Sequence, residues 1–162
     1  MAASFTVRRM EEADRPALRH LVRALNLYED SITGDRATGE ADAVAALDEV
    51  LARVAETGGI ALVAVQADSV IGHLFLTLDT APPYVRADLR RRAWVADAFV
   101  QEAWRSRGAF RAMLARAEAH AREAGCRRMM IGVLTGNDLA ERVYRRAGFA
   151  PHALEMMRDI AP

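Results

Sequence analysis

The sequence predicts a mixed α/β (α+β) protein in which one mixed sheet has helices on both faces. Short apolar runs rich in branched residues are interspersed with longer stretches whose apolar residues recur every three or four positions. Their order along the chain is a strand, two helices, three strands, a helix, a strand, a helix and a strand. A doubly wound dinucleotide-binding fold would instead alternate strand and helix strictly and place its glycine fingerprint in the first crossover.

The N-terminal part of the chain predicts a strand and two helices. Residues 5–9 alternate in polarity like a short strand, and residues 11–16 combine acidic side chains with a proline suited to a helix start. The polar stretch 30–39 separates the first helix from the second. The expected core faces follow helical spacing: Leu18, Leu21, Val22 and Leu25 in the first helix, and Val44, Leu47, Leu51 and Val54 in the second.

The middle of the chain predicts a β-hairpin followed by a loop. The branched runs 60–67 and 70–78 are joined by Asp68-Ser69, a two-residue connection typical of a tight turn. Residues 79–92, which contain Pro82-Pro83 and three consecutive arginines, form the expected loop.

The remaining chain alternates strands and helices. A strand over 93–100 leads into a helix over 108–123, followed by a strand over 129–134, a helix over 138–147 and a final strand over 154–159. The third helix has an apolar face made by Phe110, Met113, Leu114 and Ala117.

Length and charge narrow the class of protein. At 162 residues the chain is most simply one domain, 1–162, and its 22 basic and 22 acidic residues balance, which indicates neither a nucleic-acid partner nor a membrane partner. No apolar stretch is long enough to cross a bilayer, and the N-terminus lacks the hydrophobic segment of a secretory signal. We therefore expect a cytoplasmic protein.

Histidine and cysteine usage does not indicate a metal site. The histidines are scattered without ligand spacing, and we expect each to be an ordinary core or surface residue: His20, His73, His120 and His152. The single cysteine, Cys126, excludes an internal disulfide and follows Gly125 at an expected buried junction.

The segment after the fourth strand is the candidate binding site. A helix N-terminus offers N–H groups without intrahelical partners and a partial positive charge, so a pyrophosphate placed there is held largely by main chain. Arg105, Arg107 and Arg111 add full charges around the same point, and Gly108 permits a close approach of the backbone. The alternative for the arginines is a solvated basic turn.

Three segments resemble the GCN5-related N-acetyltransferase (GNAT) family. The turn 105–110 matches the family pattern of Arg or Gln, two residues, Gly, one residue, and Gly or Ala, except at its last position, Phe110. Asn137, followed seven residues later by Tyr144 and then by Gly148-Phe149, is similar to a second family segment. The opening residues 7–14 resemble the family's first strand and helix start. The resemblance covers nearly the whole chain in element order.

The resemblance implies a GNAT acyl-CoA acyltransferase fold, with a mixed, mostly antiparallel central sheet of about six to seven strands. It implies acetyl-CoA as acyl donor, bound in a gap beside the strand ending at Val100, where the pantetheine arm pairs as an added strand would. A backbone N–H of this strand would stabilise the developing oxyanion. The residues expected at acetyl-CoA are Ala98, Phe99, Val100, Arg105, Ser106, Arg107, Gly108, Ala109, Phe110, Arg111, Asn137 and Tyr144.

Phe110 departs from the family pattern, which has Gly or Ala at this position. Because the N–H groups rather than the side chains bind phosphate, we expect Phe110 to turn toward the core and binding to survive. The alternative is that Phe110 fills the site.

Tyr144 and Asp97 are the candidate catalytic residues. By resemblance, the Tyr144 hydroxyl donates a proton to the departing CoA thiolate, and the alternative is a core tyrosine. An alkyl ammonium, with a pKa of about 10, must lose a proton before it attacks, and Asp97 in the central strand is the candidate base. The alternative for Asp97 is a buried acceptor that bonds main chain or an arginine. Asn137 suits both a helix N-cap and a CoA contact.

The acceptor is open at this stage. In the family the first two helices, their linker and the loop before the central strand shape the acceptor pocket, which here means residues 25–36 and 81–92. The candidate substrate residues are Tyr28, Glu29 and Tyr84. Small amines, amino-acid derivatives and protein N-termini all remain possible acceptors.

Two functions of different class follow from the resemblance. The first is an N-acetyltransferase that transfers the acetyl group of acetyl-CoA directly to a primary amine of a small molecule or peptide. The alternative is a non-catalytic acyl-CoA-binding sensor. Few residues follow Phe149, so we expect an exposed sheet edge to be covered by a second copy in a homodimer.

Overall fold

Five strands form a single sheet in the order in which they occur along the chain. The structure, a computed structural model, describes residues 4–160. Each neighbouring pair is antiparallel except the last, which is parallel. The strands of the sheet, in order, are β1 (Thr6–Arg9), β2 (Ile60–Gln66), β3 (Ser69–Thr80), β4 (Arg91–Val100) and β5 (Arg128–Ile131).

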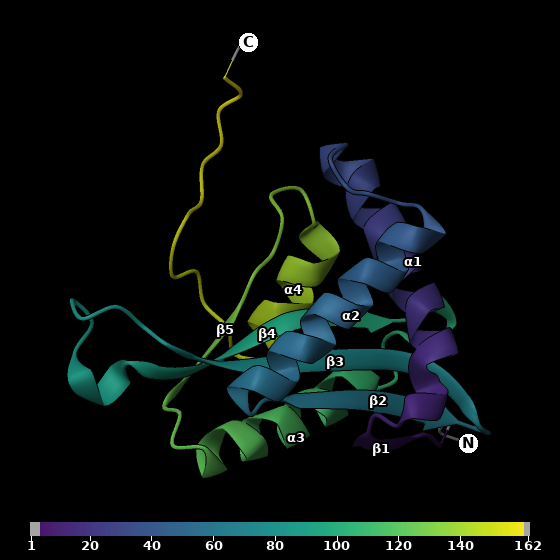
Figure 1. The fold of residues 1–162 in the computed structure, drawn as a ribbon, viewed down its shortest axis with the longest axis horizontal. Helices are drawn as coiled ribbons and strands as arrows, with labels where there is room; N and C mark the ends of the chain where they lie inside the picture. Colours follow the sequence, from purple (N-terminus) through teal and green to yellow (C-terminus); the bar gives the residue numbers. More distant parts are fainter. Residues whose placement is uncertain (1–3, 161–162) are drawn as a thin grey trace.

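Helices cover both faces of this sheet, as the sequence predicts (Figure 1). One face packs against α1 (Arg15–Thr33) and α2 (Glu40–Thr57), and the opposite face packs against α3 (Ala109–Glu123). The fourth helix, α4 (Asp138–Arg146), follows β5 and lies beside the end of the sheet where β4 and β5 meet. The mixed α/β fold class is therefore confirmed.

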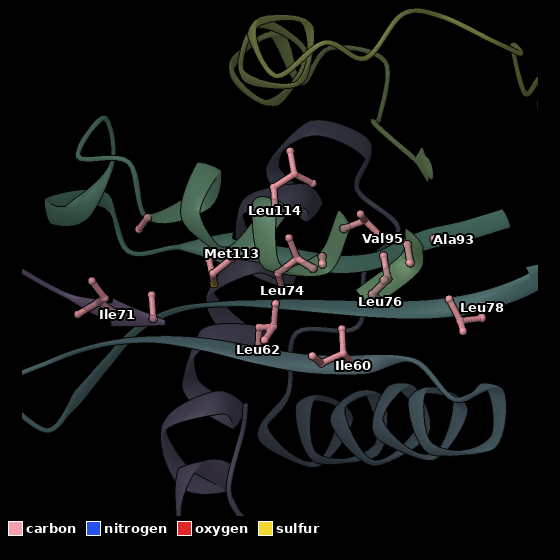
Figure 2. Packing of buried hydrophobic residues seen from close by; sticks show 14 residues of the cluster. Ile60, Leu62, Ile71, Leu74, Leu76, Leu78, Ala93, Val95, Met113 and Leu114 are labelled. Carbon is pink, nitrogen blue, oxygen red and sulfur yellow. The ribbon is translucent and has the colours of Figure 1, made fainter. Parts of the chain in front are cut away.

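The two hydrophobic clusters follow the predicted helical faces. Leu18, Leu21 and Val22 of α1 are buried against the sheet, as is Leu47 of α2. On the opposite face, the cluster drawn in Figure 2 joins three sheet strands to α3. Its α3 members include Met113, Leu114 and Ala117, and Phe110 is only partly buried at its edge.

An ion pair fixes the start of α1 against the first strand. The guanidinium of Arg8 donates to both carboxylate oxygens of Asp14, at 2.6 and 2.8 Å, and the Glu11 amide donates to the same carboxylate at 2.8 Å. The hydrogen bond from Arg8 lowers the pKa of Asp14 below its ordinary value, because it stabilises the ionised form. The residues that resemble the family's opening thus connect β1 to α1.

The hairpin turn between β2 and β3 lies one residue earlier than predicted. Ala67 and Asp68 occupy its two central positions, with φ of 44° and 65°, the signs that a type I′ turn requires. Ser69 is the first residue of β3 rather than part of the turn.

The last predicted strand is absent, so the described chain has five strands rather than the expected six to seven. Residues 150–160 form no regular secondary structure and run away from the sheet (Figure 1). A strand needs a hydrogen-bonded neighbour, and apolar composition alone does not supply one. The exposed apolar side chains of this tail are Leu154, Met156, Met157 and Ile160.

Two further boundaries differ from the prediction. β5 ends at Ile131 instead of residue 134, because residues 132–134 diverge from β4 and line a cavity. β3 continues to Thr80, and β4 already begins at Arg91, so the predicted loop 79–92 is shorter at both ends.

Replacing Gly59 by alanine is expected to destabilise the fold by about 1–3 kcal/mol, because overpacking forces backbone shifts. A Cβ at Gly59 would overlap the Leu76 carbonyl oxygen of the neighbouring strand. Gly132→Ala is the matched control, since a Cβ at Gly132 meets nothing within 4 Å. Denaturant unfolding measures both variants. Equal stability of the two variants would contradict the close approach of the strands at Gly59.

Candidate functional site

A cavity of about 830 Å³ runs along the C-terminal half of β4. One wall comes from α1, the opposite wall comes from α4 and the residues after β5, and the far end is the turn that enters α3. Segments distant in sequence therefore meet here: residues 25–36, 94–100, 104–111, 131–147 and Glu155 all contribute lining side chains.

The sheet opens at this cavity. Pairing between β4 and β5 covers only four residue pairs and ends at Val95 opposite Ile131. Beyond that point β4 continues to Val100 with no strand on its β5 side within residues 4–160. The edge from residue 96 to 100 therefore has no strand partner on this side and offers main-chain groups to a ligand that binds as an added strand, although the Val100 carbonyl already accepts from Arg105. The expected gap beside Ala98, Phe99 and Val100 is where the structure opens, and these residues line the cavity.

A β-bulge marks the start of the opening. Phe75 of β3 pairs with Asp97, whereas the next residue, Leu76, pairs with Val95, so Ala96 is an extra residue in β4. A bulge bends its strand and redirects the side chains that follow. It brings Asp97 to the same face of the sheet as its partner Phe75, which packs with α1 and α2.

The turn between β4 and α3 presents a run of free amides. Gly108 caps α3 with φ of 90°, and the first helical bond is donated by Ala112 to the Gly108 carbonyl. The main-chain N–H groups of Ser106 to Arg111 donate no hydrogen bond to any group within residues 4–160. Ser106 also has a positive φ, 60°, so the chain curls around this point. Such a concave set of amides at a helix N-terminus is suited to an anion.

The three arginines of the turn take different positions. Arg105 lines the cavity, donates from Nε to the Val100 carbonyl at 3.1 Å and lies 5.6 Å from the Phe99 ring. Arg111 also lines the cavity. Arg107 instead stacks on Trp104, with 5.1 Å between its guanidinium carbon and the ring centroid, and its side chain lies outside the cavity lining.

Phe110 and Tyr144 stand together at the cavity. Their ring centroids are 5.6 Å apart, and Phe149 meets Tyr144 edge-on at 6.2 Å. Phe110 is half-buried: it packs at the edge of the core and also lines the cavity. It therefore neither turns fully toward the core nor fills the site, the two alternatives that the sequence left open. The free volume of about 830 Å³ remains beside it.

The Tyr144 phenol is held in its neutral form. Burial, together with the negative charges of Asp97 and Glu29, raises the pKa of Tyr144 to about 12. Both effects disfavour the phenolate. At neutral pH the side chain is therefore a proton donor, which is the state that a general acid needs.

Asn137 connects α4 to α1. Its side-chain oxygen accepts from the Ala140 amide at 3.1 Å as the helix N-cap, and the Tyr28 hydroxyl donates to the same oxygen at 3.3 Å. Asn137 is buried and also lines the cavity. The N-cap role predicted from the sequence is thus observed, and the Tyr28 contact is an addition that the sequence did not indicate.

Within residues 4–160, the Asp97 side chain is bonded to neither main chain nor an arginine. Its Oδ1 lies 3.0 Å from Nε2 of His73, a buried residue of β3. The histidine was expected to be an ordinary core or surface residue, and no spacing in the sequence connects it with Asp97. Only the register of β3 against β4, including the bulge at Ala96, brings the two side chains together.

Residues of α1 and of the linker that follows it form one wall of the cavity. Tyr28 and Glu29 line it, and the Arg36 side chain donates to Glu29 at 2.9 Å. The hydrogen bond to Glu29 raises the pKa of Arg36. Trp94, for which the sequence predicts no role, lines the same cavity.

The loop 81–92 does not contribute to this cavity. Tyr84 is 88% exposed and lies outside the cavity lining. Arg90 donates to the carbonyls of Val85 and Pro83, and Arg92 pairs with Asp79 at 2.6 Å, so these arginines hold the loop itself.

Within residues 4–160, no three side chains of the His, Cys, Asp and Glu types gather at a distance suited to one metal ion. None of the helices in that range has both the length and the apolar character needed to span a membrane. Burial raises the pKa of the half-buried Cys126 thiol, which lies outside the cavity lining.

Solved structures share this architecture at low sequence identity. A protein from Bacillus halodurans superposes with a TM-score of 0.79 and 16% identity, covering 96% of this chain and 99% of that one. The aminoglycoside N-acetyltransferase AAC(6')-Iy, in complex with a bisubstrate analogue of CoA, gives a TM-score of 0.74 and 17% identity over 98% and 99% of the two chains. Glucosamine-6-phosphate N-acetyltransferase from Arabidopsis thaliana gives 0.69 and 12% over 98% and 99%.

No curated protein matches this sequence. The family model described as "Acetyltransferase (GNAT) family" matches residues 21–149, which include β4, the amide-lined turn and α4. The chain therefore belongs to the GNAT acetyltransferase family and has the fold of that family.

Proposed function

We propose that this protein is an N-acetyltransferase that passes the acetyl group of acetyl-CoA directly to a primary amine. The observation that carries the proposal is the run of free amides from Ser106 to Arg111, which ends the same cavity that holds Asp97 and Tyr144. An anion site, a free strand edge and two proton-transfer groups are thus adjacent in one space.

In the proposed complex acetyl-CoA has one orientation in the cavity, with its diphosphate at the turn before α3. Its diphosphate is held by the amides of the turn, with Arg105 and Arg111 adding charge. From there its pantetheine arm follows the free edge of β4 and pairs with main-chain groups of residues 98–100. A backbone N–H of this edge then faces the thioester carbonyl and stabilises the negative charge that develops on its oxygen.

Asp97 and Tyr144 move the protons. Asp97 takes one proton from the acceptor ammonium, which frees the nitrogen lone pair to attack the thioester carbonyl carbon. Tyr144 gives its proton to the CoA sulfur as the carbon–sulfur bond breaks, and the second amine proton restores the phenol. One proton passes from Asp97 to solvent in each turnover. No covalent enzyme intermediate is needed, and Cys126 lies outside the cavity lining.

The acceptor lies against Tyr28 and Glu29. The carboxylates of Glu29 and Asp97 face the same space, since both raise the pKa of Tyr144. Glu29 is paired with Arg36, so the charge of Asp97 is the one that favours a cationic amine. Aminoglycosides and glucosamine 6-phosphate, named for two of the structurally similar proteins, are the first amines to test. Amino-acid derivatives and peptide N-termini complete the set.

Release of free thiol from acetyl-CoA across this amine panel tests the proposal, with acetyl-CoA binding measured separately by calorimetry. The proposal requires binding and an acceptor-dependent thiol release. Tight binding without turnover of any amine would instead support the alternative, a non-catalytic acyl-CoA sensor. Absence of binding would exclude both.

We further propose a homodimer in which a second copy covers the exposed tail. Four large apolar side chains of the tail, Leu154, Met156, Met157 and Ile160, are each at least 77% exposed, and burying them against a partner is favourable. We predict a dimeric mass by light scattering at micromolar concentration and a monomeric mass for the double variant Met156→Asp, Met157→Asp. The control Leu27→Asp changes an exposed apolar residue of α1 and is expected to leave the dimer intact. A monomeric unmodified protein would contradict the proposal.

A further inference from the structure

The pair formed by His73 and Asp97 is the most unusual polar feature of the core. The His73 side chain has no exposed surface and stacks on Phe75, with ring centroids 4.6 Å apart, while Phe99 lies 6.4 Å away on β4. Its Nε2 atom is 3.0 Å from Asp97 Oδ1. Its Nδ1 atom is the only buried side-chain nitrogen or oxygen without a hydrogen-bond partner in the described part of the chain.

The sheet register explains why these two side chains meet. His73 is paired across the strands with Phe99, and Phe75 with Asp97, so His73 and Asp97 are diagonal neighbours on one face. The bulge at Ala96 sets which β4 residues share that face. Asp97 can therefore receive a hydrogen bond from behind, on the side away from solvent.

The proton positions follow from the partners. An ionised carboxylate only accepts hydrogen bonds, so the proton of a neutral imidazole must sit on Nε2 for the contact with Asp97 to form. Nδ1 is then a bare lone pair among aromatic rings. The opposite tautomer would bury an unpaired N–H instead and would turn Nε2 into an acceptor facing a carboxylate, which costs more.

The second oxygen of Asp97 remains available to the cavity. Oδ2 makes no hydrogen bond within residues 4–160, and it is not among the buried atoms without partners. The Asp97 side chain is 17% exposed, and the residue lines the cavity. One carboxylate oxygen is thus held from behind while the other faces the space proposed for the acceptor.

We propose that His73 is a positioning residue that fixes Asp97 for proton transfer, an inference that rests on the proposed function. Nε2–H holds Oδ1, and the acceptor ammonium gives its proton to Oδ2: an N–H bond breaks, an O–H bond forms, and the lone pair stays on nitrogen. His73 keeps its own proton throughout. Its contribution is orientation, since a displacement of about 1 Å at a reacting group is enough to cost about a hundredfold in rate.

A purely structural role for His73 predicts a different pattern of effects. Such a residue would alter folding stability, and its replacement would weaken activity regardless of what occupies position 97. A positioning residue loses its effect once Asp97 can no longer act as base. The two roles are therefore separated by a double-mutant cycle.

The cycle uses His73→Leu, which removes the donor, His73→Gln, which keeps an N–H at the end of a side chain of similar reach, and Asp97→Asn. With an amine found in the panel, His73→Leu is expected to lower kcat about tenfold to a hundredfold with KM for acetyl-CoA unchanged. His73→Gln should retain most of kcat. In the Asp97→Asn background, His73→Leu should have no further effect. His120→Leu, which removes a histidine contact to the Gly58 carbonyl outside the cavity lining, is the control expected to leave kcat unchanged.

A measurement without turnover tests the contact itself. Long-range proton–nitrogen NMR of the unmodified protein should show the His73 proton on Nε2, and should show a perturbed His73 ring in Asp97→Asn. A proton on Nδ1, or effects of the two substitutions that simply multiply, would overturn the inference; if His73→Leu does not fold, loss of kcat in a folded His73→Gln overturns it equally. Absence of turnover with every amine would overturn the proposed function and this role with it, whereas a proton on Nδ1 would overturn only the inference about His73.

Discussion

Replacing Tyr144 by phenylalanine is expected to lower kcat by about 10²–10⁴-fold, the usual contribution of a positioned general acid. The substitution removes only the hydroxyl, which makes no hydrogen bond within residues 4–160, and leaves the ring between Phe110 and Phe149. Acetyl-CoA affinity, measured by calorimetry, should therefore change little. The expected loss of kcat therefore comes from the missing proton donor and not from weaker acetyl-CoA binding.

The dependence of kcat on pH tests the role of Tyr144 as proton donor independently of the substitution. A phenol in water has a pKa of about 10, so an ordinary tyrosine acid would begin to fail near that pH. Burial and the neighbouring carboxylates raise the pKa of Tyr144 to about 12, so the neutral donor persists well above it. We expect kcat to show no alkaline loss from Tyr144 below about pH 11. Unchanged kcat in Tyr144→Phe with a verified acceptor would remove this residue from the mechanism.

Replacing Gly108 by alanine is expected to weaken acetyl-CoA binding about tenfold to a hundredfold, since the loss of one charge-assisted hydrogen bond costs about 1.5–3 kcal/mol. Gly108 has φ of 90°, which alanine adopts only at a cost of about 1–2 kcal/mol. Relief of that strain is expected to rotate the peptide groups of the turn and so to redirect their free amides.

Gly125→Ala is the matched control for this variant. Gly125 lies just beyond the opposite end of α3, has φ of 79°, and, like Gly108, has open space where a Cβ would be placed. Both variants should lose similar stability in denaturant unfolding. Only Gly108→Ala should lose acetyl-CoA affinity in calorimetry, and equal affinities for the two variants would contradict the role of the turn.

Most of the fold could be predicted because hydrophobic periodicity reports which residues are buried. The core positions Leu18, Leu47 and Met113 follow the helical spacing in the sequence. The final strand could not be excluded in this way. The segment 154–159 has the apolar composition of a strand, but a strand also needs a partner edge, which is a property of the whole sheet.

The candidate site was predictable where it depends on local main chain. The turn from Arg105 to Arg111 could be located because a glycine between a strand and a helix has a direct structural meaning. The contact between His73 and Asp97 could not be found, because it depends on the register of β3 and β4 and on the extra residue Ala96. Tyr84 was a candidate substrate residue because its loop precedes the central strand. In the structure its side chain is exposed to solvent, because the sequence does not show which way the loop turns.

The amide resonances of Ser106 to Arg111 give the most direct test of the acetyl-CoA site. A proton–nitrogen NMR titration of the unmodified protein with acetyl-CoA should shift these six amides to the positions of hydrogen-bonded groups, because they have no partner within residues 4–160 of the free chain. Amides at the far end of α3, near Gly125, should stay in place. Saturable binding that leaves the six amides unshifted would contradict the claim that this turn holds acetyl-CoA.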